Sequence, residues 1–248
     1  MTNINKGNIQ KILDKIRIKK NDKILVYSNL LALGQYNSNL PKLIINNLKK
    51  KVGINGEIIM PTYFFKKSKK IIKPQIDKKT NGILTYYFFK REKKIFQSNS
   101  LFHSHIGYSK SFCTHARNSK YFSFGKGSDF DFFLKKKFKI LSIGLNPSKF
   151  LTYLHHVEEL LKVSHRKWIY ISRKLVKKEN TKKVRIKYYA RKTRKASINV
   201  DKIFLYLIKK GLKVSKVDLR FGKIFLCEIV DVDHFLKKYL KNFLLKKI

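Results

Sequence analysis

His155 and Glu158, three residues apart, are the pair in this sequence best suited to acid–base chemistry. They follow an apolar run, residues 140–144, that is typical of a buried strand. Residues i and i+3 of a helix share one face, so the imidazole and the carboxylate can touch. A carboxylate that orients an imidazole makes a general base near neutral pH. The same spacing also occurs in surface and packing pairs, so it does not by itself establish an active site.

The elements that must position this pair follow an α/β order. Apolar periodicity predicts a helix over residues 8–19, a strand over 23–27, a helix over 40–51 and a strand over 56–62. This order predicts an α/β fold, a layered sheet with parallel pairing and helices on both faces. A strand over 138–144 then precedes a helix over 152–162. The C-terminal third is predicted to be α+β, with strands over 184–190, 212–219 and 223–228 and helices over 200–210 and 231–243.

Length and composition favour one large domain, residues 1–248, because 43% of the residues are hydrophobic and can form a core. The sequence contains no run of eighteen apolar residues, so it predicts no transmembrane helix. The first residues lack the apolar segment of a signal peptide. Cys113 and Cys227 have neither metal-ligand spacing nor the density of a disulfide scaffold. We therefore expect a cytoplasmic protein with no metal site and no membrane insertion.

The net charge of +43, from 58 basic and 15 acidic residues, allows two interpretations. The lysines are dispersed and accompany many Ile, Asn, Phe and Tyr residues, which is typical of drift toward A/T-rich codons. The alternative is a polyanion site, for which residues 186–192 mix basic and aromatic side chains. No zinc-finger, helix-turn-helix or RNA-recognition pattern is evident, so nucleic-acid binding remains an alternative that is not favoured.

Four further segments carry a family resemblance. Residues 27–34 read YSNLLALG and residues 56–63 read GEIIMPTY. Residues 98–104 read SNSLFHS, and residues 124–128 read FGKGS, followed by Gly144 and by TYLHHVE at 152–158. In this order and spacing, they resemble the motifs of the aminoglycoside 3-N-acetyltransferase family, also called antibiotic N-acetyltransferases, in a divergent form. The resemblance covers residues 22–170, and residues 171–248 are interpreted as a C-terminal extension of the same domain.

The resemblance implies an acyltransferase that moves acetyl from acetyl-CoA to an amine on a sugar-like ring. It implies acetyl-CoA contacts in the first motif, where a strand ends and a helix opens, because free backbone N–H groups and the helix dipole favour an anion. These contacts are Ser28, Asn29, Leu30 and Gly34. Thr62, just past a strand end, and Ser104 are the other two expected contacts. The alternative interpretation is structural: Ser28 or Asn29 would cap a helix, and Ser104 would be a loop hydroxyl that faces water.

The sequence departs from the family where the usual catalytic residues stand. Ser100 replaces the usual histidine of the third motif, and Lys149 replaces an acidic residue that commonly lies three positions before the motif threonine. One interpretation is a branch that relies on another base, and the other is an inactive homologue that keeps the fold.

If the chain is active, His155 is the expected general base or amine-binding group. Glu158 is expected to orient it and to attract a cationic amine. His103 is the second candidate, because its segment normally supplies the base, and His105 is the third. The remaining histidines are expected to be structural: His115, His156, His165 and His234.

The charge also bears on the substrate. A surface this basic would repel a polycationic aminoglycoside, whereas an anionic, nucleotide-linked amino sugar suits the field better. We therefore predict acetyl-CoA and an amino-sugar substrate, nucleotide-linked or an aminoglycoside. A homodimer is kept open as the assembly.

Overall fold

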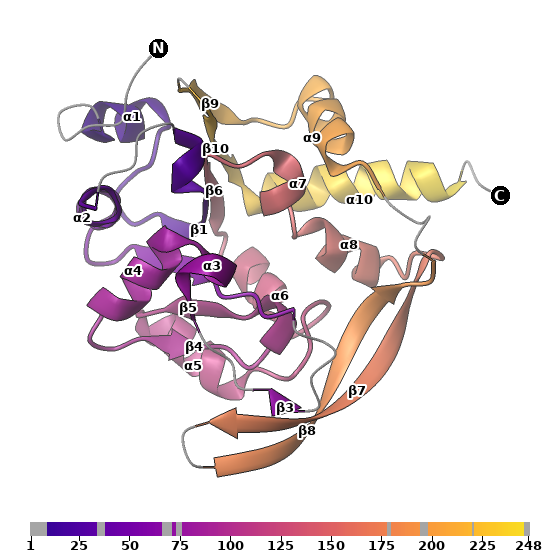
Figure 1. Ribbon diagram of the computed structural model, residues 1–248. Coiled ribbons are helices and arrows are strands. Elements are labelled where there is room, and N and C mark those ends of the chain that lie inside the picture. Colours follow the sequence, from indigo (N-terminus) through magenta and orange to yellow (C-terminus); the bar gives the residue numbers. More distant parts are fainter. Residues whose placement is uncertain are drawn as a thin grey trace.

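The computed structural model describes residues 9–33, 38–65, 71–72, 76–177, 180–193, 198–219 and 221–245. Within them, a seven-stranded sheet has the order β4-β5-β2-β1-β6-β10-β9 (Figure 1). Its strands are β1 Lys23–Ser28, β2 Glu57–Pro61, β4 Phe96–Gln97, β5 His105–Gly107, β6 Lys139–Ile143, β9 Ser215–Asp218 and β10 Lys223–Glu228. The central strands β2, β1 and β6 are parallel, as predicted for the first two, and both flanks are antiparallel.

Helices cover both faces of this sheet, which confirms the predicted layered α/β fold (Figure 1). Alternate residues of β1 point to opposite faces, so Ile24 and Val26 join one core while Leu25 and Tyr27 join the other. The first core contains α1 Ile9–Lys15, α2 Leu40–Val52 and α4 Ile83–Arg91. The second contains α5 Lys110–Asn118, α6 Asp129–Lys135, α7 Pro147–Phe150, α8 Leu154–Leu160, α9 Val200–Lys209 and α10 Ile229–Leu245.

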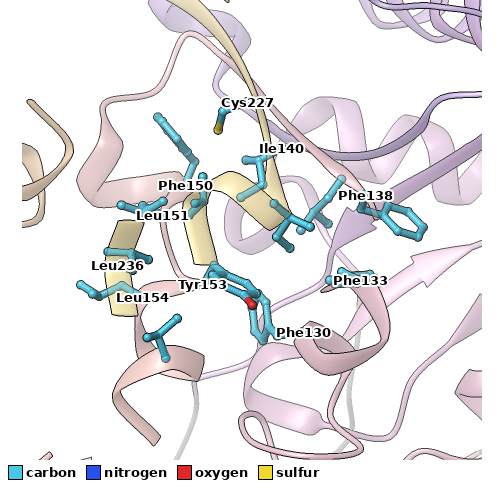
Figure 2. Close-up of a cluster of buried hydrophobic side chains, with 14 of the residues drawn as sticks. Phe130, Phe133, Phe138, Ile140, Phe150, Leu151, Tyr153, Leu154, Cys227 and Leu236 are labelled. Carbon is cyan, nitrogen blue, oxygen red and sulfur yellow. The ribbon is translucent and has the colours of Figure 1, made fainter. Parts of the chain in front are cut away.

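The second core fixes the helices that carry the candidate site. Figure 2 shows Phe130 of α6 next to Tyr153 at the start of α8, with Phe133 and Leu154 in the same apolar cluster. All four side chains are fully buried. Each such side chain contributes about 1.5–3 kcal/mol by leaving water, so α6 and α8 are held firmly against the sheet.

A long hairpin leaves the body of the molecule after α8. Its strands, β7 Arg166–Lys177 and β8 Asn180–Arg191, pair antiparallel along their whole length, and the short strand β3 Ile71–Ile72 joins β7. In Figure 1 the hairpin forms an arm beside the sheet. A third apolar cluster, including Phe64, Phe102 and Ile186, packs its inner side against the body. The sequence predicted only part of β8 and did not predict β7.

Three short elements complete the description: the 3-10 helices η1 Leu30–Leu33 and η2 Leu101–His103, and the helical turn α3 Lys78–Asn81. The helix that was expected to open directly after Ser28 is therefore only the single turn η1. Among the helices of the described residues, none is both long and apolar enough to cross a membrane.

Candidate active site

A cavity of about 440 Å³ lies where α8, η2, the glycine turn of residues 124–128 and the base of the hairpin meet. It contains two of the three predicted catalytic residues, His155 and His103. The other lining residues are Phe65, Phe124, Arg166, Tyr188, Ala190 and Arg191. The cavity thus combines two imidazoles, two guanidinium groups and aromatic walls.

His155 and Glu158 make the contact that their spacing predicted. Nδ1 of His155 lies 2.7 Å from Oε2 of Glu158, one helical turn further along α8. An ionised carboxylate can only accept hydrogen bonds, so Nδ1 carries the proton in this pair. The lone pair of the neutral ring is then on Nε2, which is the arrangement that a general base needs.

Glu158 is held beneath His155 by further contacts. Its side chain is 0% exposed. Nε2 of His165 lies 2.9 Å from Oε1, and Nε of Arg166 lies 2.6 Å from Oε2 in a close ion pair. Burial alone would raise the pKa of Glu158, but the hydrogen bond from His155 and the charge of Arg166 hold it below its ordinary value. The expectation that Glu158 attracts a cationic amine is therefore wrong, because its carboxylate is shielded and already neutralised.

The environment of His155 keeps its ring uncharged. Burial lowers the pKa of His155, and the nearby positive charges of Arg166 and Arg191 lower it too, while the hydrogen bond to Glu158 works in the opposite direction. Nη2 of Arg166 lies 2.8 Å from Nδ1 and 3.5 Å from Nε2. Because a guanidinium can only donate, it cannot hydrogen-bond to the protonated Nδ1, and its contact with the lone pair of the ring is the longer one, to Nε2. The net effect holds the pKa of His155 below its ordinary value, so the ring can accept a proton at neutral pH.

His103 reaches the same cavity from η2, with its side chain nearly buried among aromatic rings. Its ring centroid lies 4.9 Å from that of Tyr63, 5.1 Å from Phe65 and 4.6 Å from Phe124. Phe124 also contacts the ring of His155, at 5.7 Å. The structure therefore brings the first and second candidate bases together around one phenylalanine, although they lie 52 positions apart in the sequence.

His105 belongs to a separate, buried network. Asp129 is 0% exposed, and its Oδ2 lies 2.7 Å from Nδ1 of His105 and accepts a hydrogen bond of 2.5 Å from Ser98. Its Oδ1 lies 2.8 Å from Nε2 of His115. Burial would raise the pKa of Asp129, but the hydrogen bonds from His105 and His115 hold it well below its ordinary value. None of these residues lines the cavity, so the structure does not bring His105 to the site.

Thr62 and Ser104 lie together, as two predicted acetyl-CoA contacts should, but they are buried and bonded to each other. Oγ of Ser104 donates to the carbonyl oxygen of Thr62 at 2.8 Å, and the two hydroxyl oxygens are 3.0 Å apart. The side-chain amide of Gln97 donates to Oγ1 of Thr62 at 3.1 Å. These bonds join the end of β2 to the start of β5, and a contact with acetyl-CoA stays a prediction.

The first motif lies at the carboxyl end of β1. Ser28 is the last residue of this strand, and Asn29 lines a second cavity of about 630 Å³. Leu30 is 3% exposed and packs in the core, so its side chain is not available to a ligand. Gly34, the fourth predicted contact, lies outside the described residues.

The second cavity lies outside the carboxyl ends of β1 and β6, with Gly144 and the β9–β10 turn as further walls. Lys149 and Lys223 also line it. Lys149 is the lysine that replaces the usual acidic residue, and here it adds to a basic wall. Open α/β sheets commonly bind ligands at this edge.

A small polar cluster lies beside residues that line the two cavities. The hydroxyl oxygens of Tyr27 and Tyr63 are 3.0 Å apart, and Thr152 hydrogen-bonds to both tyrosines. Tyr27 lies two positions before Asn29, and Tyr63 contacts the ring of His103. The motif threonine therefore belongs to this cluster.

The sequence analysis missed Arg166 and Arg191, which bring the positive charge to the cavity. They face each other across the first pair of the hairpin register. The run of apolar and aromatic residues 168–171 is the signal that could have revealed β7, but it is short and basic residues flank it on both sides. Cys227 has no place in this chemistry, because burial raises the pKa of its thiol to about 12.

Comparisons with known proteins bear on the family and the fold of the chain. The family profile described as aminoglycoside 3-N-acetyltransferase matches residues 25–241. Solved structures with a similar fold include AAC-IIIb bound to CoASH, with a TM-score of 0.80 and 15% identity over 97% of both chains. AAC-VIa bound to sisomicin has a TM-score of 0.79 and 16% identity over 97% of this chain and 98% of that one.

The YokD protein from Bacillus subtilis is similar as well, with a TM-score of 0.75 and 16% identity over 96% of this chain and 98% of that one. A search of curated proteins finds no match. The profile covers most of the chain. The chain therefore belongs to the aminoglycoside 3-N-acetyltransferase family, whose members are acyltransferases that use acetyl-CoA as co-substrate.

Proposed function

We propose that this protein is an acetyl-CoA-dependent N-acetyltransferase that acts on an amino group of a sugar, with His155 as general base. One observation carries the proposal: His155 lines a cavity while its Nδ1 lies 2.7 Å from a fully buried carboxylate. This arrangement supplies a neutral, oriented imidazole, even though Ser100 replaces the histidine that is usual in the third motif. It favours an active branch of the family over an inactive homologue.

In the proposed reaction, the unprotonated amine attacks the thioester carbonyl carbon of acetyl-CoA. Nε2 of His155 takes a proton from the attacking amine as the new C–N bond forms. The tetrahedral intermediate then collapses, the C–S bond breaks, and the thiolate of coenzyme A leaves with the electron pair. Glu158 positions the ring and stabilises the imidazolium that forms, so it acts through His155. A well-placed base contributes roughly 10²–10⁴ in rate.

The acetyl-CoA is proposed to enter the second cavity, where Asn29 and the predicted contact Ser28 lie at the end of β1. Lys149 and Lys223 give this cavity a basic wall that suits the phosphates of coenzyme A. The cluster of Tyr27, Tyr63 and Thr152 then lies between the donor and the acceptor. Residues 22–170 and 171–248 are proposed to act as one domain, which is supported by the pairing of β10 with β6.

Two sugar classes remain candidates for the acceptor: an aminoglycoside and a nucleotide-linked amino sugar. The first is supported by the family and by the sisomicin complex of AAC-VIa. The second is supported by the net charge of +43, which attracts anions and repels polycations.

Polyanion binding is a second candidate function, and it rests on the outer side of the hairpin. Nζ of Lys187 lies 4.1 Å from the ring centre of Trp168, and the guanidinium of Arg185 lies 4.1 Å from that of Tyr170. Neighbouring cations and aromatic rings of this kind can bind phosphates and stack on bases.

Calorimetric titration with acetyl-CoA, at physiological and at high salt, separates these functions. Tight binding that survives high salt, followed by coenzyme A release when an amino sugar is added, supports the acetyltransferase. Tight binding without turnover of any amine supports the inactive homologue. Binding that salt abolishes as completely as that of random RNA contradicts the acetyltransferase and favours the polyanion function.

A further inference from the structure

The charges around the acceptor cavity are unusual for a site that binds a polycation. Its described lining residues include two arginines, Arg166 and Arg191, and no carboxylate. Of the nearby acidic residues, Glu158 is 0% exposed beneath His155 and Arg166, and Glu159, beside Gly125, does not line the cavity. An aminoglycoside, with several ammonium groups, would find no acceptor of matching charge on these walls.

The two arginines are not equivalent. Arg166 is buried, and its charge is neutralised by Glu158 in the ion pair of 2.6 Å. Arg191 is exposed at the mouth of the cavity, and within the described part of the chain no ion pair or side-chain hydrogen bond is found for it. With His155 neutral, the cavity therefore holds one positive charge that no carboxylate of the described residues pairs with.

The walls next to Arg191 suit a sugar ring. Phe65, Phe124 and Tyr188 provide aromatic surface, and Ala190 leaves space beside them. Ligand sites typically combine such apolar walls with a few polar groups that fix the orientation of the ligand. Here His155 would face the amine of the sugar, and Arg191 is free to bind another substituent of the same ring.

We propose that the acceptor is an amino sugar that carries its own carboxylate or phosphate, and that Arg191 pairs with this anion while the amine faces His155. The inference rests on the proposed acetyltransferase function and selects an acidic amino sugar within it. Arg191 thereby acts as a specificity-determining residue. A guanidinium is suited to this role because its fork of N–H donors matches both carboxylate and phosphate.

The test compares acceptors that differ in charge. Coenzyme A release from acetyl-CoA is measured with glucosamine, a glucosamine phosphate, glucosaminuronic acid and sisomicin, using wild-type protein and Arg191→Gln. The wild type is expected to use an acidic sugar with a kcat/KM about tenfold or more above that of glucosamine, since a charge-assisted pair of this kind is worth about one order of magnitude. The better of the two acidic sugars identifies the anion as phosphate or carboxylate.

Arg191→Gln should remove most of this advantage, so that the acidic sugars and glucosamine are used with similar kcat/KM. Arg185→Gln, a control on the same hairpin whose guanidinium stacks on Tyr170, should keep the advantage. A wild-type kcat/KM for glucosamine or sisomicin that equals the value for the acidic sugars would overturn the inference. An equal loss with all four acceptors in Arg191→Gln would overturn it too.

A binding measurement separates this inference from the proposed function. If no amine is acetylated, the proposed acetyltransferase function fails. Calorimetry with the glucosamine phosphate still tests Arg191: about tenfold weaker binding to Arg191→Gln than to the wild type supports its role. Equal affinity for both proteins overturns that role.

Discussion

Glu158→Gln is the substitution that tests most of the site at once, because one carboxylate holds three side chains. Its oxygens lie 2.7 Å from Nδ1 of His155, 2.9 Å from Nε2 of His165 and 2.6 Å from Nε of Arg166. Glutamine keeps the shape but removes the charge. The guanidinium of Arg166, whose side chain is 6% exposed, is then left in the protein without a counterion.

The expected cost follows from this burial. Removing one partner of a buried ion pair typically costs about 3–5 kcal/mol of the free energy of unfolding. For a chain of this size each kcal/mol lowers Tm by about 2–4 °C, so Glu158→Gln should lower Tm by about 10 °C. The variant should also lower kcat by roughly 10–100-fold, because His155 loses the acceptor that fixes its proton on Nδ1.

The pH profile gives the sign of the electrostatic effect. The hydrogen bond to Glu158 raises the pKa of His155 against the lowering effect of burial. Without that carboxylate the pKa of His155 falls further. The acidic limb of the pH profile of kcat should therefore move to lower pH in the activity that the variant retains. Thermal melts and kcat profiles of the purified variant measure both effects.

A double-mutant cycle with Arg166→Gln isolates the ion pair. In the doubly substituted protein both charges are gone, so its loss of unfolding free energy should be smaller than the sum of the single losses by about 0.5–3 kcal/mol. Additive losses would refute the view that Glu158 neutralises Arg166. A Glu158→Gln protein with unchanged Tm and kcat would refute its positioning role.

Three further predictions concern charge and pH. Arg191→Gln removes a charge that lowers the pKa of His155, so the acidic limb of kcat should move to higher pH; an unmoved limb would contradict the proximity of the two groups. Asp129→Asn should lower the free energy of unfolding by about 3–5 kcal/mol in urea titrations while leaving kcat per folded molecule intact, and a loss of kcat would place this network in catalysis. Burial lowers the pKa of His156 from 6.5 to about 4, so stability is retained above 6.5 and lost as pH falls toward 4. Urea titrations at neutral pH and near the lower value should show a loss of about 3 kcal/mol, which His156→Gln should abolish.

Elements with strong local signals could be predicted from the sequence. The apolar runs in β1, β2 and β6 are nearly continuous because these strands are buried on both faces. The contact of His155 with Glu158 follows from helical spacing alone. Both predictions depend on neighbours in sequence, which is why they are confirmed.

The rest of the site depends on contacts between distant segments. Arg166 and Arg191 meet only through the register of a hairpin whose first strand has a weak pattern, with exposed Lys167 and Lys174 among its apolar residues. The burial of Glu158 was equally hidden, since charge in a sequence does not reveal exposure. Leu30 was expected to contact acetyl-CoA because of its place in the first motif, but its side chain is packed in the core.

The central claim is that His155 is the base of an acetyltransferase, and the rate of coenzyme A release with His155→Ala tests it most directly. Acetyl-CoA binding is measured in parallel, and His234→Ala, which alters an exposed histidine of α10, serves as the control. The account predicts that kcat falls roughly 10²–10⁴-fold in His155→Ala alone, with acetyl-CoA affinity unchanged. A His155→Ala protein that retains wild-type kcat, or a loss found instead in His103→Ala, would contradict it.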